Sequence, residues 1–232
     1  MRVVVACAVI GMSGLPEAIG QLRGGSQART ATPSEETGAT ERSADQTWVP
    51  SDEVRVQIES AIPEKAPATP ERRRRLLIYD ANVGYPGHPS RFVANWAFQR
   101  MGEKTDAFEA IVSRDPQVFR PENLRQFDAV VLNNTVGNLF EDPTLRQSLA
   151  EFVYAGGGLL GIHGTTVAFT RWTEGAKDDW PEFGRMLGAR GAAHRESDER
   201  VMVKLDSPHH PLNRPFQGQS FEYRDEFFRV HD

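Results

Sequence analysis

Three separated histidines of this 232-residue chain are candidates for chemistry. His88 lies shortly after the apolar run 76–79, His163 directly follows the apolar run 158–162, and His194 comes further along the chain. Imidazole transfers protons near neutral pH and binds metals such as zinc. The three side chains are therefore predicted to be ligands of a divalent metal or acid–base groups. The alternative for each is a hydrogen-bonding residue without chemistry.

Other polar residues accompany these histidines. Amide and hydroxyl groups both donate and accept hydrogen bonds, and carboxylates accept protons or bind cations. If the fold gathers these groups at one place, they can form a polar pocket. The residues in question are Asn134 in the sequence Asn133-Asn134-Thr135, Thr165 shortly after His163, and Glu226 in the late acidic pair Asp225-Glu226.

Short apolar runs alternate with helical patterns from Leu76 onward, and this alternation predicts the elements that position the polar residues. Strands that are buried on both faces and joined by helices form a parallel α/β sheet. Ligands of such sheets bind beyond the carboxyl ends of the strands. The predicted strands are 76–79, 108–112, 127–132 and 158–162, and the predicted helices are 90–101 and a segment from its N-cap Asp142 to Gly156.

Composition and charge exclude several classes of protein. The chain has 27 basic and 32 acidic side chains, a formal net charge of −5 and 39% hydrophobic residues, as in ordinary globular proteins. Because no basic face is visible in the sequence, no nucleic-acid partner is expected. The single cysteine, Cys7, can form neither an internal disulfide nor a thiolate zinc cage.

The first 70 residues are predicted to precede the main domain. Residues 1–20 resemble a short signal peptide, which predicts a periplasmic or secreted protein, although a mis-assigned start or a first strand is the alternative. The apolar run 3–12 is too short for a membrane span. Residues 21–50 contain almost no large apolar side chains and are predicted to be a disordered linker. Residues 51–70 are predicted to form a short helix and an extended connector.

One glycine-rich segment resembles a dinucleotide-binding motif, but its position relative to the predicted strand does not fit that function. The segment 156–161 reads Gly-Gly-Gly-Leu-Leu-Gly and formally matches the dinucleotide-binding pattern. That pattern requires the glycines to follow a strand, whereas here they precede one. We therefore interpret them as a helix C-cap and tight turn.

An ordered set of motifs in residues 51–232 resembles the ThuA-like, trehalose-utilisation family. That family has the flavodoxin-like three-layer sandwich of the class I glutamine amidotransferase-like superfamily, with a central, mostly parallel sheet. We therefore expect this fold for residues 71–232. The motifs are Leu76–Asp80, His88-Pro89-Ser90, Phe127–Thr135, Gly157–His163, Trp180–Gly184 and Asp225-Glu226.

The resemblance implies a role in carbohydrate metabolism with a small-molecule sugar as partner, either a trehalose-like disaccharide or its 3-keto derivative. It leaves the reaction type open. His163 stands where amidotransferase relatives have their nucleophilic cysteine, so cysteine-dependent amidotransferase chemistry is not expected. Our hypothesis for the site has His163, His194 and Glu226 as catalytic residues, and His163 and His194 as ligands of a metal such as zinc. His88, Asn134 and Thr165 are expected to bind sugar hydroxyls.

Two departures from the family pattern leave other functions open. Family members often continue with Ala-Ala-Thr-Asp after the histidine of the fourth strand, whereas this chain reads Gly164-Thr165-Thr166-Val167 and lacks that carboxylate. The family also continues beyond the Asp-Glu strand, so we expect residues 71–232 to be incomplete at the C-terminus. The alternatives to an enzyme are a non-catalytic carbohydrate-binding domain and an interaction domain, and a homo-oligomer remains open.

Overall fold

The computed structural model describes residues 49–171, 176–196 and 198–231. The predicted signal peptide and all but the last two residues of the predicted linker lie outside these ranges. None of the helices in the described ranges is long and apolar enough to cross a membrane.

The centre of the fold is a four-stranded parallel sheet, as the alternating sequence pattern predicts. Its strands are β1 (Arg74–Tyr79), β2 (Phe108–Ser113), β3 (Ala129–Asn133) and β4 (Gly158–Ile162), in the order β2-β1-β3-β4. This order agrees with the flavodoxin-like expectation, in which the chain reverses direction across the sheet between β1 and β3. β3 begins two residues later than predicted, and Phe127 instead packs beneath the guanidinium of Arg75.

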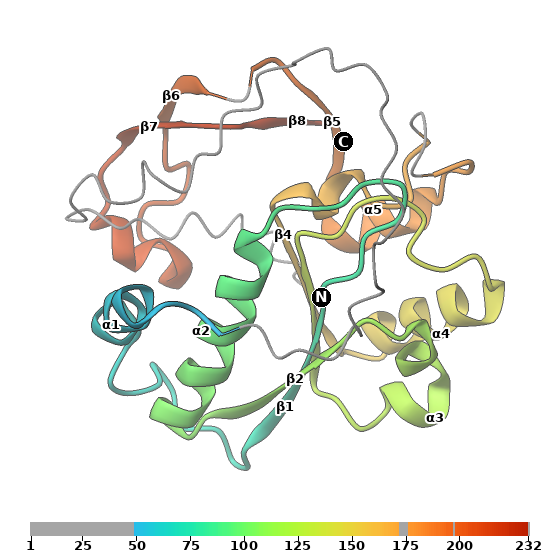
Figure 1. Cartoon of the computed structure of the whole chain (residues 1–232), viewed down its shortest axis with the longest axis horizontal. Coiled ribbons are helices and arrows are strands. Elements are labelled where there is room, and N and C mark those ends of the chain that lie inside the picture. Colours follow the sequence, from blue (N-terminus) through green and yellow to red (C-terminus); the bar gives the residue numbers. More distant parts are fainter. Residues whose placement is uncertain (1–48, 172–175, 197, 232) are drawn as a thin grey trace, which may run out of the picture.

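Helices cover both faces of this sheet (Figure 1). The helices α1 (Asp52–Ala61) and α2 (Ser90–Thr105) lie on one side, and α3 (Pro121–Leu124), α4 (Pro143–Tyr154) and α5 (Pro181–Leu187) lie on the other. Short 3₁₀ helices complete the connections at Pro116–Phe119, His163–Val167 and Pro211–Phe216.

Helix α4 begins after its N-cap Asp142 and ends at the glycine run 156–158, as the sequence predicts. The Asp142 carboxylate accepts a hydrogen bond from the amide of Thr144 at 2.8 Å, which satisfies a free donor of the first turn. At the other end, Gly156 has a φ of 104°, and the amide of Gly157 donates to the carbonyl of Phe152 at 2.9 Å. This is a Schellman C-cap, so the glycine run ends a helix and does not bind a dinucleotide.

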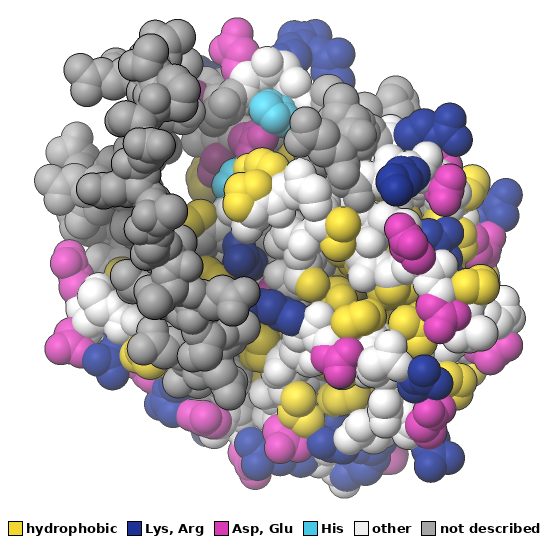
Figure 2. Space-filling view, turned by 45° about the vertical axis from the view of Figure 1, so that its right-hand side comes forward, with side chains coloured by type: hydrophobic (Ala, Val, Ile, Leu, Met, Phe, Trp, Pro, Cys, Tyr) yellow, Lys and Arg dark blue, Asp and Glu magenta, His cyan; other side chains and the backbone are white. Residues whose placement is uncertain are grey.

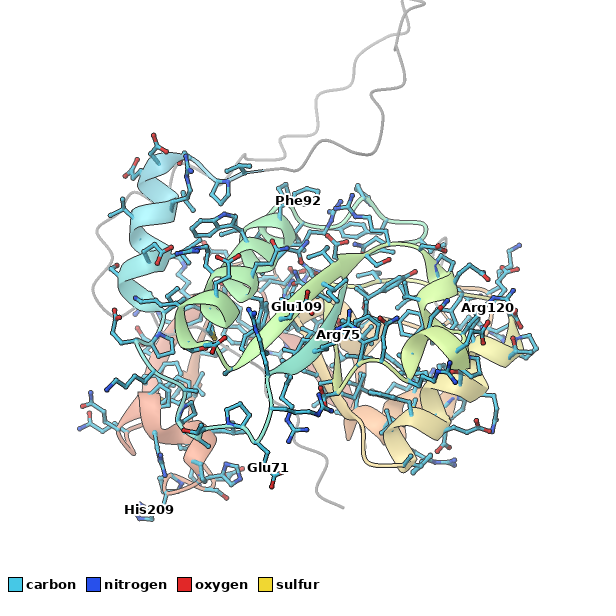
Figure 3. The ribbon with its side chains drawn as sticks, turned by 90° about the horizontal axis from the view of Figure 1, so that it is seen from below. Glu71, Arg75, Phe92, Glu109, Arg120 and His209 are labelled. Atoms are coloured by element: carbon cyan, nitrogen blue, oxygen red, sulfur yellow. The ribbon has the colours of Figure 1, made fainter. Side chains whose placement is uncertain are left out.

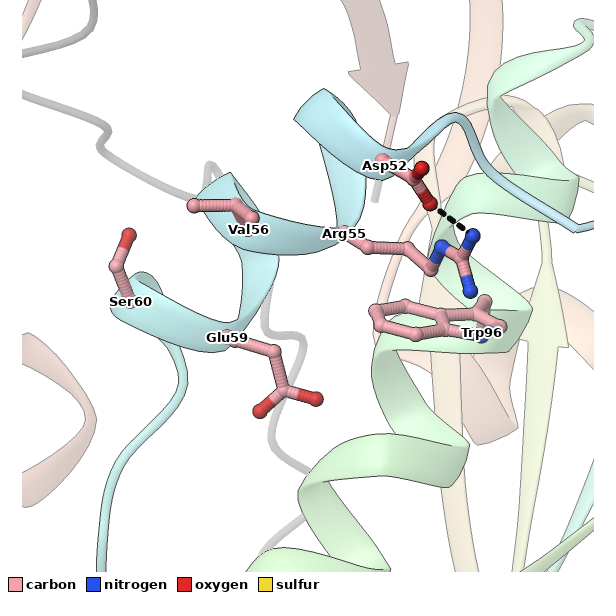
Figure 4. A pocket seen from close by; sticks show the side chains of 6 residues that line it. All are labelled: Asp52, Arg55, Val56, Glu59, Ser60 and Trp96. Carbon is pink, nitrogen blue, oxygen red and sulfur yellow. Dashed lines mark hydrogen bonds and ion pairs between the residues drawn. The ribbon is translucent and has the colours of Figure 1, made fainter.

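Helix α1 docks onto α2. Ile58 is buried, and Lys104 of α2 donates to the Glu59 carbonyl at 3.0 Å. Figure 4 shows the shallow hollow between the two helices, where the Arg55 side chain lies between Asp52 and Trp96. No histidine lines this hollow, so it is separate from the candidate site.

The arginine run that leads into β1 is paired rather than freely solvated. The Asp128 carboxylate accepts hydrogen bonds from Arg72 and Arg74, and the Nε of Arg75 lies 3.1 Å from a carboxylate oxygen of Glu109. Figure 3 shows Arg75 and Glu109 next to each other on the neighbouring strands β1 and β2. These ion pairs are exposed and contribute little stability individually.

The later part of the domain consists of two antiparallel strand pairs. β5 (Arg190–His194) pairs with β8 (Phe228–His231), and β6 (Glu199–Val203) pairs with β7 (Phe221–Asp225). Both pairs lie at the top of Figure 1, beyond the carboxyl ends of the parallel strands. They therefore face the edge of the sheet where ligands of this fold class bind.

The hydrophobic core lies between the sheet and helices α3 to α5. Its fully buried members include Leu77 of β1, Val130 and Leu132 of β3, Leu149 of α4 and Phe183 of α5. These side chains join elements that are distant in the sequence, so the core holds the strand ends in their relative positions.

We expect the Leu149→Ala substitution to lower the free energy of unfolding by about 2–5 kcal/mol, because it removes a fully buried side chain and leaves a cavity. Urea denaturation followed by circular dichroism measures this change. Gln147→Ala, on the exposed face of the same helix, is the control and should change stability by less than about 0.5 kcal/mol. Equal effects of the two substitutions would contradict the assigned core.

Candidate active site

Three histidines converge on one carboxylate, that of Glu226. The Nε2 atom of His194 lies 2.7 Å from Oε1 of Glu226, and the Nε2 atom of His163 lies 3.2 Å from Oε2. The Nε2 atom of His88 lies 3.6 Å from the same Oε2. The structure thus brings together four of the six predicted site residues, and they come from four separate segments of the chain.

The ends of β3 and β4 place His163 at the edge of the sheet. Asn133 and Ile162 are partners in the parallel register, so the next residues, Asn134 and His163, lie side by side. Both have left-handed backbones, with φ of 56° and 51°. Non-glycine residues adopt this conformation at a cost, and it is enriched where the chain serves a function. The turn after β4 therefore sets the direction of the His163 imidazole at a cost in strain.

A buried polar network holds the segment that carries His88. The Arg91 guanidinium donates to the carbonyls of Pro86 and His88, at 2.9 and 3.3 Å. Its Nε lies 3.8 Å from a carboxylate oxygen of Asp80, the residue after β1. Asp80 is fully buried and also accepts hydrogen bonds from Arg114 at 2.8 and 3.0 Å. The position of His88 thus depends on a charged network at the end of β1.

The antiparallel pair β5–β8 supplies the remaining two groups. His194, the last residue of β5, is the register partner of Phe228 in β8, and Glu226 lies in the turn just before β8. The Phe228 ring contacts the rings of both His163 and His194 edge to face, with centroids 5.2 and 5.4 Å apart. This ring therefore joins the late strands to the end of β4 and fixes the spacing between the two imidazoles.

The site is partly shielded from water. The Glu226 side chain is 14% exposed, whereas those of His88 and His194 are 38% and 35% exposed. Burial lowers the pKa of His163 below its usual value and outweighs the Glu226 carboxylate, which acts in the opposite direction. His163 is therefore a neutral imidazole near pH 7, the form that accepts a proton or binds a metal. Figure 2 shows histidine side chains next to acidic ones at the molecular surface.

The residues whose atoms lie close enough to bind one ion are not the two histidines predicted as metal ligands. Single atoms of His88, His163 and Glu226 lie within 4.8 Å of one another. From the sequence, His163 and His194 are the expected metal ligands, and His88 is expected to bind the substrate. His88 gives no stronger sequence signal than any other loop histidine, because its approach to Glu226 depends on the turn fixed by Arg91.

The other two predicted substrate-binding residues lie deeper in the protein. Thr165 is fully buried, and its hydroxyl contacts the carbonyls of Leu132 and Ile162 and the Thr135 hydroxyl, at 2.9 to 3.1 Å. It therefore ties together the ends of β3 and β4. Asn134 is 4% exposed, and its buried side-chain oxygen has no hydrogen-bond partner among the described residues. Buried polar atoms normally have a partner, so this oxygen is a candidate ligand contact.

The family model of ThuA, described as trehalose utilisation, matches residues 75–232, which is more than half of the chain. This chain belongs to the ThuA family. The match includes all four residues at the site, and it confirms the resemblance drawn from the ordered motifs. No curated protein matches the chain significantly.

A solved structure supports the same ThuA-like fold. The crystal structure of a ThuA-like protein from Bacteroides uniformis ATCC 8492 matches this chain with a TM-score of 0.53 and 19% sequence identity. The match covers 71% of this chain and 65% of that protein. At this identity the similarity concerns the fold alone, and it agrees with the predicted α/β architecture.

We expect the Glu226→Gln substitution to lower the pKa of His163 further, because the carboxylate favours the protonated imidazole and the amide does not. The neutral form of His163 would then persist to lower pH. Histidine NMR titration of chelator-treated protein measures the change, and the exposed His209 is the internal reference. An unchanged or raised pKa of His163 would contradict the contact with Glu226.

Proposed function

We propose that this chain is an enzyme of carbohydrate metabolism that acts on trehalose-like disaccharides or on their 3-keto derivatives. The observation that carries the proposal is the convergence of three imidazoles on Glu226 beyond the carboxyl ends of a parallel sheet. Membership in the trehalose-utilisation family supports the substrate class. The proposed catalytic residues are His163 and Glu226, and His194 positions the Glu226 carboxylate.

The chemistry of these groups suits a 3-keto sugar better than an unmodified one. A ketone at carbon 3 acidifies the hydrogen on carbon 2. When a base removes this proton, the electron pair is held as an enolate, with its charge on the ketone oxygen. The pair then forms a double bond between carbons 1 and 2 as the bond from carbon 1 to the glycosidic oxygen breaks, and that oxygen receives a proton from an acid. One base and one acid suffice, and imidazoles beside a carboxylate can take both roles.

Partial burial strengthens the interactions that this chemistry needs. The Glu226 carboxylate is largely removed from water, so it stabilises a neighbouring imidazolium more strongly than an exposed carboxylate would. At the same time, the exposed fractions of His88 and His194 leave the cluster open to a small molecule. The buried oxygen of Asn134 is available as a further polar contact.

We expect the full chain to convert a 3-keto disaccharide, and the His163→Ala and Glu226→Gln variants to do so at least about 100-fold more slowly. Mass spectrometry and a rate assay of the products measure this. His209→Ala is the matched control with unchanged turnover, because His209 lies at the periphery, far from the parallel sheet (Figure 3). Thermal melts of all variants separate lost chemistry from lost folding.

The outcome also decides between the proposed enzyme and its alternatives. Full turnover by the His163→Ala variant would contradict the proposed active site. If the folded protein binds the sugar but forms no product, it is a carbohydrate-binding domain and not an enzyme. Neither binding nor turnover would favour an interaction domain.

A further inference from the structure

The spacing of the His88 imidazole from Glu226 does not match an ordinary hydrogen bond. The Nε2 atom of His88 lies 3.6 Å from Oε2, beyond hydrogen-bonding distance, and the Nε2 atom of His163 lies 3.2 Å from it, at the long limit. Only His194, at 2.7 Å from Oε1, has the distance of a charge-assisted hydrogen bond. The two carboxylate oxygens therefore have different surroundings.

The same spacing fits three ligands of one ion. A tetrahedral zinc ion with ligand bonds of about 2.0–2.1 Å separates its ligand atoms by roughly 3.3 Å. The observed 3.2 and 3.6 Å lie on either side of this value, and each of the three residues offers one ligand atom within 4.8 Å of those of the other two. We propose that Nε2 of His88, Nε2 of His163 and Oε2 of Glu226 bind one divalent metal ion of the zinc class.

The chemistry of the donors favours this class over magnesium or calcium. Two nitrogens and one oxygen suit zinc and the neighbouring transition metals, whereas magnesium and calcium prefer oxygen ligands alone. Three protein ligands also leave the fourth position of a tetrahedral ion open, as in catalytic zinc sites. The exposed fractions of the two imidazoles, 38% for His88 and 29% for His163, leave the centre accessible from solvent.

His194 is a positioning residue in this arrangement. Its Nδ1 atom is buried and has no hydrogen-bond partner among the described residues, so a proton there would lack an acceptor. The proton therefore belongs on Nε2, which lies 2.7 Å from Oε1 of Glu226, so that Oε2 is left for the ion. Such contacts to a ligating carboxylate commonly orient metal ligands.

The inference rests on the proposed function in one respect, since it names the ion that the same centre would hold. When bound, a zinc-class ion polarises a carbonyl oxygen and so stabilises the negative charge that develops there. In a 3-keto sugar, that charge develops on the ketone oxygen when the neighbouring proton leaves. The ligand set thus favours substrates with a carbonyl group.

Zinc binding to the full chain tests the inference directly. After chelator treatment and dialysis, titration with zinc chloride in a calorimeter should give one equivalent bound, and elemental analysis should give the same ratio. His88→Ala and His163→Ala should each weaken binding by at least about 100-fold, because each removes a direct ligand. His194→Ala should keep the stoichiometry and weaken binding by about 10–100-fold. His209→Ala, outside the cluster, should bind as the wild type does.

Two further measurements guard against variants that fail to fold. Zinc should raise the melting temperature of the wild type and of His209→Ala, but not that of His163→Ala. Cobalt in place of zinc should give the visible spectrum of a four-coordinate site in the wild type. Absence of stoichiometric zinc in the wild type, or unchanged zinc binding by His88→Ala and His163→Ala, would overturn the inference. Loss of binding by His194→Ala as complete as that by His163→Ala would also overturn it.

Activity assays distinguish this failure from failure of the proposed function. Turnover of a 3-keto disaccharide by a protein that binds no zinc would contradict the metal site and support the enzyme. If the protein binds one zinc ion at the three ligands but converts no sugar, the proposed function is wrong and the metal site stands.

Discussion

The contact between the Glu226 carboxylate and three imidazoles is the interaction on which the candidate site depends. A carboxylate that is only 14% exposed loses much of its hydration and needs partners in the protein. Its partners come from the connection between β1 and α2, from the end of β4 and from β5, so they meet only when the parallel sheet and the late strand pairs are assembled. The site is thus a product of the tertiary fold rather than of any local motif.

The parallel register explains why His163 reaches this position. Pairing of Asn133 with Ile162 ends β3 and β4 at the same level, and the buried Thr165 hydroxyl then fastens the two ends together. With the strand ends fixed, the left-handed backbones of Asn134 and His163 can persist despite their cost. The Phe228 ring packs against both His163 and His194. The fixed strand ends and this ring together determine the distance between the imidazoles.

Local patterns predicted most of the sheet but only part of the site. The apolar runs, the Asp142 cap and the glycine C-cap act through neighbouring residues, so the sequence alone could identify the strands β1 to β4 and helix α4. The antiparallel pairs β5–β8 and β6–β7 were not predicted. β6 and β7, for example, alternate partly buried with exposed residues and form no continuous apolar run. The contact of His88 with Glu226 was missed for a similar reason. It depends on the long-range network from Asp80 through Arg91, which no spacing in the sequence reveals.

Comparison of the two buried carboxylates at this edge of the sheet shows which one is suited to chemistry. Asp80 is more deeply buried, but it accepts hydrogen bonds from Arg114 and Asn95 and lies next to Arg91. Guanidinium groups remain charged at every physiological pH, so the charge of Asp80 is permanently balanced and the network is structural. Glu226 is instead surrounded by imidazoles, which gain and lose protons near neutral pH and bind metals. The same sheet edge therefore contains one carboxylate that fixes the geometry and another whose partners can change state, and only the second can take part in a reaction.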